Sequence, residues 1–266
     1  MDLGLDGKAC AITGGSRGIG REVARRLCAE GASVLLVARS ADALAEAARE
    51  CELAGGSAEP LALDVTEPDA GERILAAATT SFGQLDVLVN NAGTARWRPL
   101  DEVPDDDWQG AWELNVMAPM RAMRAAAPPM AERGWGRIVN VSSTAAKRPS
   151  ALMPEYSVAK AAELSLSRLF ADRYAADGVL VNAVCPGPTK SELWMAEGGL
   201  LDQSKQAGGH QTRQEALQTA GAKRPIGRLA EVAEIADAIV FLCSERASYV
   251  AGAAWSVDGG TVQVII

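Results

Sequence analysis

Short apolar runs rich in β-branched residues alternate with longer helical segments along most of the chain. Seven strands are predicted, at Ala9–Thr13, Ser33–Ala38, Ala58–Leu63, Val87–Asn90, Arg137–Val141, Leu180–Val184 and Ala254–Val257. Long helices are predicted over Trp108–Ala131, bent near Pro119 and ending around Pro128 and Pro129, and over Tyr156–Ala176. Strands separated by helices form βαβ units, so the pattern predicts an α/β fold with a doubly wound parallel sheet covered on both faces.

No linker, repeat or low-complexity tract divides the 266 residues, which predicts one domain over residues 1–266. The alternation breaks only over Pro188–Arg224, a polar segment that contains glycine. An irregular segment of this length inside an α/β domain is more often functional than a linker. We therefore expect residues 188–224 to form a lid over a substrate.

The charge and cysteine patterns exclude several classes of protein. The 26 basic and 34 acidic side chains give a net charge of −8, and no basic run predicts a nucleic-acid partner. No apolar stretch approaches the roughly 18 residues of a membrane span, and no signal peptide is apparent at the start. The five cysteines contain no C-x-x-C pair, which predicts free thiols in the cytoplasm. A single histidine, His210, excludes sites that need two, and no metal is predicted.

A glycine-rich turn, Thr13–Gly20, follows the first predicted strand and opens the first helix. Glycines at Gly14, Gly18 and Gly20 would let the backbone approach a pyrophosphate at the helix N-terminus. The alternative is a glycine turn needed only for tight packing of helix on strand. Its position in the chain favours a dinucleotide site, and the absence of a following G-K-[ST] excludes a P-loop.

The end of the second strand indicates which dinucleotide is bound. An NAD site usually carries a carboxylate there, but this strand continues into Arg39 and Ser40. Arg39 and Arg17 could together hold a 2′-phosphate, although either one alone reads better as a solvated surface residue. The pair favours NADP(H), with NAD(H) as the weaker alternative. Asp64, after the third strand, could accept from the adenine amino group or cap a helix.

Tyr156 and Lys160 are spaced i and i+4, so a helix places both side chains on one face. A nearby ammonium favours phenolate and would lower the pKa of Tyr156 from about 10, which suits an acid/base near neutral pH. Ser142 and Ser143 end the fifth strand, at the edge of the sheet where ligands bind. Hydroxyls, phenol and ammonium are therefore expected to converge there.

These motifs together resemble the short-chain dehydrogenase/reductase family, whose fold is of the Rossmann type. The matching positions are Thr13–Gly20, Asn90–Gly93, Asn115, Ser142 and Ser143, Tyr156 and Lys160, and Pro186, Gly187 and Thr189. They occur in family order and the resemblance runs over essentially the whole chain, through Asp258–Gly260.

The resemblance implies a role for each of these residues. Tyr156 would protonate the carbonyl oxygen, Lys160 would lower its pKa and bind the nicotinamide ribose, and Ser143, rather than Ser142, would hold the substrate oxygen. Asn115 would hold a water, and Thr189 would bind the carboxamide. The cofactor site predicted in this way comprises Gly14, Ser16, Arg17, Gly18, Ile19, Gly20, Arg39, Ser40, Asp64, Val65, Asn91, Ala92, Gly93, Tyr156, Lys160, Pro186, Gly187 and Thr189.

The substrate is less well indicated. The predicted pocket comprises Trp97, Leu152, Met153, Leu193, Trp194 and Met195, which suits an apolar carbonyl or alcohol. For each of these residues, packing of the lid onto the body is an equally good interpretation.

Three functions remain open: an NADP-dependent carbonyl reductase or alcohol dehydrogenase, a 3-oxoacyl-thioester reductase, and a non-catalytic NADPH-binding protein. Family members that dock an acyl carrier protein place basic residues at the ends of the two long helices. Arg133 fits that role here, but Asp177 does not. The same two helices resemble those that pair between subunits in this family, so a homodimer or homotetramer is expected.

Overall fold

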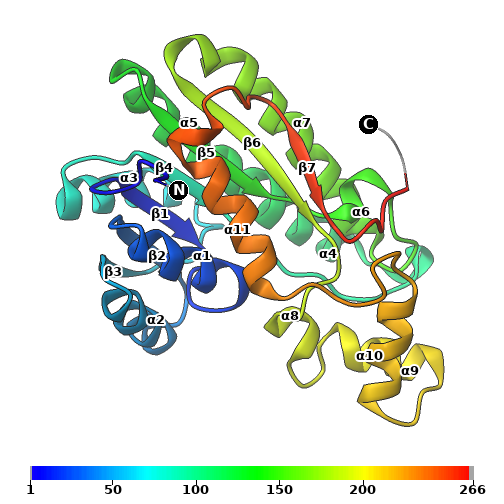
Figure 1. Cartoon of the computed structure of the whole chain (residues 1–266). Coiled ribbons are helices and arrows are strands. Elements are labelled where there is room, and N and C mark those ends of the chain that lie inside the picture. Colours follow the sequence, from blue (N-terminus) through cyan, green and yellow to red (C-terminus); the bar gives the residue numbers. More distant parts are fainter. Residues whose placement is uncertain (1, 264–266) are drawn as a thin grey trace.

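Seven parallel strands form one sheet, in the order β3-β2-β1-β4-β5-β6-β7 (Figure 1). The computed structural model describes residues 2–263. The strands are β1 Ala9–Thr13, β2 Ser33–Ala38, β3 Ser57–Ala62, β4 Val87–Asn90, β5 Gly136–Val141, β6 Val179–Pro186 and β7 Ala254–Val257. The predicted doubly wound sheet is confirmed, and no predicted strand end lies more than two residues from its observed position.

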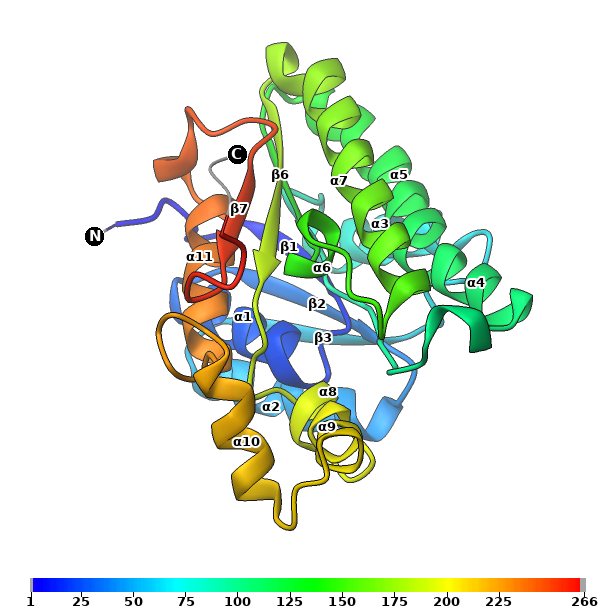
Figure 2. The ribbon, with the colours of Figure 1, turned by 90° about the vertical axis from the view of Figure 1, so that its right-hand side faces the viewer.

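Helices cover both faces of this sheet (Figure 2). One face carries α1 (Gly18–Ala29), α2 (Ala41–Leu53) and α11 (Val232–Cys243), and α1 contacts both of the others. The opposite face carries α3 (Ala70–Phe82), α5 (Ala118–Glu132) and α7 (Pro154–Tyr174), with α4 (Asp105–Trp112) against α7. Each face has its own buried apolar cluster. Within residues 2–263, no helix combines the length and the apolar character that crossing a membrane would need.

The helix predicted over Trp108–Ala131 is divided in the structure. A π-helical turn, Glu113–Met117, separates α4 from α5, and Pro119 lies in the first turn of α5. The predicted end at Ala131 lies one residue before the observed end at Glu132, but Pro128 and Pro129 lie inside α5 and do not themselves stop it. The residues whose carbonyls lose a helical hydrogen bond to these prolines, Arg124 and Ala125, are exposed and partly exposed, and packing of the buried face holds the last turn in place.

The sequence predicted an irregular segment over residues 188–224, but the structure shows helices there. These are the short helix α8 (Glu192–Met195), α9 (Leu200–Gly208) and α10 (Arg213–Ala222). Outside the segment, another short helix, α6 (Thr144–Lys147), precedes α7. Most of a small apolar cluster comes from this segment, namely Trp194, Leu200, Leu201, Ala216 and Ala220, and Leu229 just beyond the segment completes it. A capping box between Thr212 and Glu215 begins α10, and Gly209 ends α9 in the left-handed conformation. These are local start and stop signals inside a polar sequence.

Helices α3 and α5 touch at the backbone, and this contact yields a stability prediction. A methyl group on Gly71 of α3 would lie 2.5 Å from the carbonyl oxygen of Arg121 in α5. Because backbone cannot move aside cheaply, Gly71→Ala should lower the free energy of unfolding by about 1–3 kcal/mol. Urea denaturation at fixed protein concentration measures the change.

The matched control is Gly110→Ala in α4, where an added methyl meets nothing within 4 Å. Helix propensity alone predicts that this variant gains about 0.5–1 kcal/mol. Equal effects at the two positions would contradict the backbone contact as the cause.

Candidate active site

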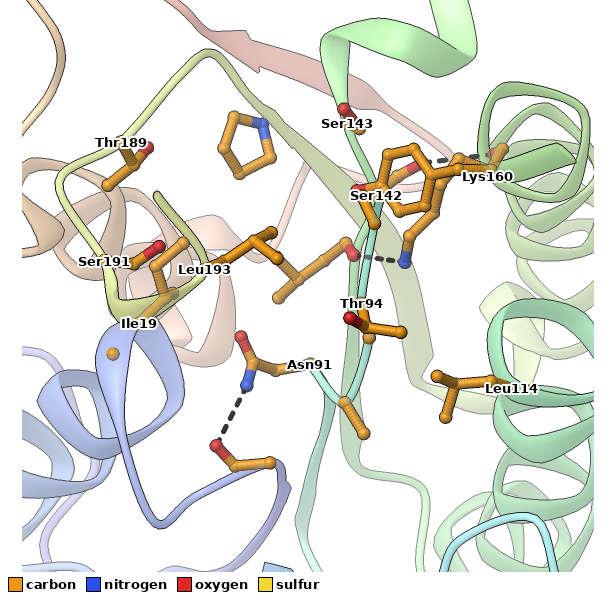
Figure 3. A pocket seen from close by; sticks show the side chains of 18 of the residues that line it. Ile19, Asn91, Thr94, Leu114, Ser142, Ser143, Lys160, Thr189, Ser191 and Leu193 are labelled. Carbon is orange, nitrogen blue, oxygen red and sulfur yellow. Dashed lines mark hydrogen bonds between the residues drawn. The ribbon is translucent and has the colours of Figure 1, made fainter. Parts of the chain in front are cut away.

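A cavity of about 1010 Å³ opens at the carboxyl ends of the strands. It is lined by the turn after β1, by residues that follow β2, β4 and β5, and by residues around α8. The strand order reverses between β1 and β4, which is where open α/β sheets bind ligands. Figure 3 shows side chains from these segments pointing into one space.

The glycine-rich turn has the backbone geometry that an anion site needs. Gly14 and Gly18 have φ values of +66° and +55°, a left-handed region that favours glycine, and both line the cavity. Gly20 is different, because it is buried and a methyl group there would lie 2.4 Å from the carbonyl oxygen of Gly14. Tight packing therefore accounts for Gly20, whereas the left-handed backbone and the position at the cavity distinguish Gly14 and Gly18.

Hydrogen bonds join this turn to the end of β4. The Nδ2 of Asn91 donates to the carbonyls of Thr13, at 3.0 Å, and of Gly14, at 3.2 Å. In return, the Thr13 hydroxyl accepts from the backbone N–H groups of Asn91 and Ala92. Two motifs far apart in the sequence thus fix one another, and Asn91 holds the loop shape in addition to lining the cavity.

Arg17 and Arg39 are both exposed at the cavity, as the sequence predicted for a phosphate clamp. Neither guanidinium group has an ion-pair or hydrogen-bond partner among residues 2–263, whereas that of nearby Arg21 pairs with two glutamates. Two unpaired guanidinium groups beside a glycine-rich turn suit a dinucleotide that carries a further phosphate.

The remaining predicted adenosine-side residues also line the cavity, and two of them have structural roles. The Oδ1 of Asp64 accepts from the backbone N–H and the hydroxyl of Thr66, and these bonds hold its pKa below the usual range. The Ser40 hydroxyl caps α2. Asp64 thus closes a local turn, and its free oxygen is what remains for a ligand.

Hydrogen bonds and the ring of Tyr156 fix the position of Lys160 at the cavity. Its Nζ donates to the Val141 carbonyl at 2.8 Å and to the Glu163 carboxylate at 3.0 Å, and lies 5.9 Å from the centre of the Tyr156 ring. Both residues are on α7, one turn apart, as the spacing predicted. The strand end at Val141 therefore positions the ammonium of the helix.

The two serines at the end of β5 have different surroundings. The buried Ser142 donates to the backbone carbonyl of Lys160 at 3.1 Å, which ties the strand to α7. Both serines line the cavity, but Ser143 is only partly buried and its hydroxyl caps α6 by accepting from the N–H of Ala145. The geometry thus favours Ser143 as the hydroxyl that meets a substrate.

The pKa of Tyr156 differs from the sequence-based expectation. Burial raises it above its ordinary value, although Lys160 and a hydrogen bond with Ser143 act to lower it, as expected. Glu163, which the sequence analysis did not consider, adds to the rise. Lys160 lowers the pKa of Tyr156, as predicted, but the effect of burial is larger.

Asn115 lies behind the cavity wall and does not line it. Its Nδ2 donates to the Ala111 carbonyl at 2.9 Å, and its buried Oδ1 has no hydrogen-bond partner among the described residues. A methyl on Gly93 would lie 3.3 Å from that oxygen and 3.8 Å from the Nζ of Lys160, so the amide and the ammonium border one spot. An unsatisfied buried acceptor beside a lysine is a site for an ordered water.

Sequence reasoning missed Ser191, which lines the cavity, and Glu163, which is buried beside Lys160 and does not line it. Ser191 follows Thr189 by two residues and lines the same loop, while the Thr189 hydroxyl itself donates to the Gly187 carbonyl. The signal for Glu163 was present, because an acidic residue at i+3 from Lys160 falls on the helix face that also carries the buried Ser167.

The substrate side is only partly as predicted. Trp97, Met153, Leu193 and Trp194 line the cavity, but Leu152 and Met195 are not among the described residues that do. Leu152 is exposed, and Met195 packs against the small apolar cluster of the segment 188–224. Polar residues share the wall, namely Arg148, Ser150 and Arg224, so the cavity is less apolar than expected.

Comparison with known proteins adds independent findings. A family model described as enoyl-(acyl carrier protein) reductase matches residues 14–262. The structure of L-sorbose reductase from Gluconobacter frateurii, complexed with NADPH and L-sorbose, is 38% identical, with a TM-score of 0.92 and coverage of 100% of both chains.

Two curated relatives align over nearly the whole chain. Cis-4-hydroxycyclohexanecarboxylate dehydrogenase of Sinomonas cyclohexanicum is 38% identical over 260 residues, covering 97% of each chain. The 3-oxoacyl-[acyl-carrier-protein] reductase of Vibrio cholerae serotype O1 is 33% identical over 262 residues, covering 98% of this chain and 100% of the relative.

Proposed function

The chain belongs to the short-chain dehydrogenase/reductase family, and from that premise we propose that it is an NADP(H)-dependent oxidoreductase that interconverts a carbonyl and a secondary alcohol. The observation that carries the proposal is the convergence of Ser143, Tyr156 and Lys160 at one end of a cavity whose other end is the glycine-rich turn. Proton machinery and dinucleotide site are thereby brought within one ligand's reach.

Bound NADPH would supply a hydride to the carbonyl carbon. Tyr156 donates its phenolic proton to the carbonyl oxygen in reduction and accepts it back in oxidation. Ser143 holds the same oxygen through its hydroxyl. Ser142 lines the cavity as well, but its hydroxyl donates to the backbone carbonyl of Lys160, so proton and substrate meet at the Tyr156–Ser143 edge.

Lys160 and Asn115 support that proton transfer from behind. An ammonium has three donors, and two of those on Lys160 go to Val141 and Glu163. The remaining donor is available to the nicotinamide ribose. The free Oδ1 of Asn115 would hold a water that links Lys160 to solvent.

Replacing Tyr156 by phenylalanine removes the proton donor without removing the ring. We expect kcat for carbonyl reduction to fall at least about 10²-fold, the size of a general-acid contribution. NADPH oxidation is followed by absorbance, and NADPH binding by fluorescence should be unchanged. Tyr249→Phe is the matched control, because Tyr249 is fully exposed and should keep full activity. Full activity in Tyr156→Phe would contradict the assigned acid.

The preference for NADP(H) is proposed to come from Arg17 and Arg39, supported by their unpaired guanidinium groups and by the NADPH in the sorbose reductase complex. Arg39→Asp exchanges attraction for repulsion at the 2′-phosphate. We expect the ratio of kcat/KM for NADPH to that for NADH to fall at least about tenfold, the value of one charged hydrogen bond.

Arg49→Asp is the control for this change, because Arg49 is exposed on α2 and does not line the cavity. Its cofactor ratio should equal that of the wild type. An unaltered ratio in Arg39→Asp would show that another group reads the phosphate.

The substrate is proposed to be a small carbonyl or alcohol with polar groups, enclosed by the segment 188–224 as a lid. The wall combines Trp97, Met153 and Leu193 with Arg148 and Arg224, which suits a compact molecule with both apolar and oxygen-bearing faces. A coupled absorbance screen with ketoses, cyclic hydroxy acids, simple ketones and 3-oxoacyl thioesters tests this. No turnover of any carbonyl would leave only NADPH binding.

A 3-oxoacyl-thioester reductase is the second candidate, supported by several curated relatives with that name. The ends of the two long helices, where family members dock an acyl carrier protein, support this candidate less. The Arg133 guanidinium donates to the Leu85 carbonyl and is thereby engaged, and α7 ends toward the acidic Asp177. The same substrate screen distinguishes the two candidate functions, because a 3-oxoacyl-thioester reductase should turn over the thioesters faster than the other carbonyl compounds.

A dimer or tetramer is proposed from exposed apolar residues on the two helices expected to pair. Val158 and Leu169 on α7 and Trp112 on α4 are 50%, 64% and 45% exposed. Light scattering should give a multiple of the 27.7 kDa chain mass. Leu169→Glu should shift the population toward monomer, while Leu53→Glu on α2 should not, although Leu53 is also exposed. A monomeric wild type would contradict the proposal.

We place the protein in the cytoplasm. All five cysteines are free and buried. Free thiols are stable in a reducing compartment, which supports this placement.

A further inference from the structure

The pair of Lys160 and Glu163 is the most buried ion pair among residues 2–263. The two side chains are 3% and 2% exposed, and the Oε2 of Glu163 lies 3.0 Å from the Nζ of Lys160. Both are on α7, one turn apart. Removing two charges from water is costly, and an apolar pair of similar volume often stabilises a core equally well. Stability alone therefore does not explain this carboxylate.

No second charge accompanies Lys160 at the Glu163 carboxylate, as far as the structure is described. From β5, Ser142 presents a hydroxyl, and from α7 itself Tyr156 presents its phenol. From β6, the Cys185 thiol is near both members of the pair, and burial raises its pKa to about 11, so it is neutral at physiological pH. Glu163 also borders a small cavity whose other lining residues are uncharged, Thr13 and Asn90 being the polar ones.

Glu163 fixes where the ammonium lies. The Val141 carbonyl at the end of β5 and the carboxylate on α7 each accept one of its hydrogens, at 2.8 Å and 3.0 Å. These two acceptors lie on different elements, so together they define the position of Nζ near Tyr156. The third hydrogen keeps a fixed direction as a result.

Glu163 also changes what the ammonium does to its neighbour. Burial alone would lower the pKa of Lys160, but Glu163 and Tyr156 outweigh it, so the pKa lies above the ordinary value and the lysine stays charged. At Tyr156, burial raises the pKa most, Lys160 opposes the rise and Glu163 adds to it. The carboxylate thus cancels part of the stabilisation that Lys160 gives to phenolate.

We propose that Glu163 is a positioning residue, whose carboxylate anchors the ammonium of Lys160 together with the Val141 carbonyl and balances its charge, so that Lys160 gives less electrostatic support to an ionised Tyr156. The inference rests on the proposed function, because it assigns Tyr156 as the acid. Glu163 acts through Lys160 and lines none of the main cavity.

The decisive variant is Glu163→Gln, which removes the charge and keeps the size and an acceptor. The chain has three tyrosines, so subtracting the titration of Tyr156→Phe isolates Tyr156 in an ultraviolet difference titration without substrate. Its midpoint should fall by about one pH unit, the effect of one nearby charge. In the holoenzyme, the acid limb of kcat/KM for alcohol oxidation should fall equally, with NADPH affinity within threefold of the wild type.

The matched control is Asp172→Asn, which removes one carboxylate from the same helix at an exposed position paired with Arg168. Its titration and pH profile should superimpose on those of the wild type. If Glu163→Gln does not fold, as judged by circular dichroism, Glu163→Met removes the charge with an apolar side chain of similar length and carries the same expectation.

An unchanged or raised midpoint in the folded variant would overturn the inference. A merely structural role would lower the melting temperature without moving the titration, and that result also overturns it. The two proposals fail separately. A wild type without turnover contradicts the proposed function while the substrate-free titration still decides the role of Glu163, and normal turnover with an unmoved titration contradicts only the latter.

Discussion

The parallel pairing of β1 with β4 is the contact on which the rest of the structure depends. From this pair the chain adds strands in opposite directions across the sheet, β2 and β3 beyond β1 and β5 to β7 beyond β4. The ends of both strands are then joined by the hydrogen bonds between Thr13 and Asn91. A cleft at this point is a consequence of topology, since helices that leave in opposite directions cannot cover the same edge. The glycine-rich turn shapes one wall of the cleft, and the hydrogen bonds from Asn91 hold that turn in place.

A second constraint acts at the other end of the cavity, where an ammonium is buried. Lys160 needs acceptors, and it takes them from Val141 on β5 and Glu163 on α7. Ser142 ties the same strand to the same helix through the Lys160 carbonyl. The chemistry of the lysine and the docking of α7 on the sheet are therefore one arrangement, and a shift of the helix would displace Tyr156 and Lys160 together.

The sheet and the motif positions were predictable because they follow from local patterns. Apolar runs specify buried parallel strands, and an i, i+4 spacing specifies one helix face. The π-helical turn at Glu113–Met117 and the helices of 188–224 were not predicted, because packing and caps decide them rather than periodicity. The raised pKa of Tyr156 was missed for a related reason. Burial and the charge of Glu163 are properties of the folded site, and neighbours in sequence indicate only Lys160.

The acidic chain and its anionic cofactor are compatible because of how the arginines are distributed. Many arginines away from the cavity, such as Arg21 and Arg228, are paired with glutamates and contribute little field. Arg17 and Arg39 at the dinucleotide end have no carboxylate partner among residues 2–263. The net charge of −8 is therefore an average over the whole chain, and it does not exclude an anionic cofactor from a site where two guanidinium groups are exposed. At the other end of the cavity, the carboxylate of Glu163 balances the ammonium of Lys160. Lys160 lines the cavity, whereas Glu163 does not.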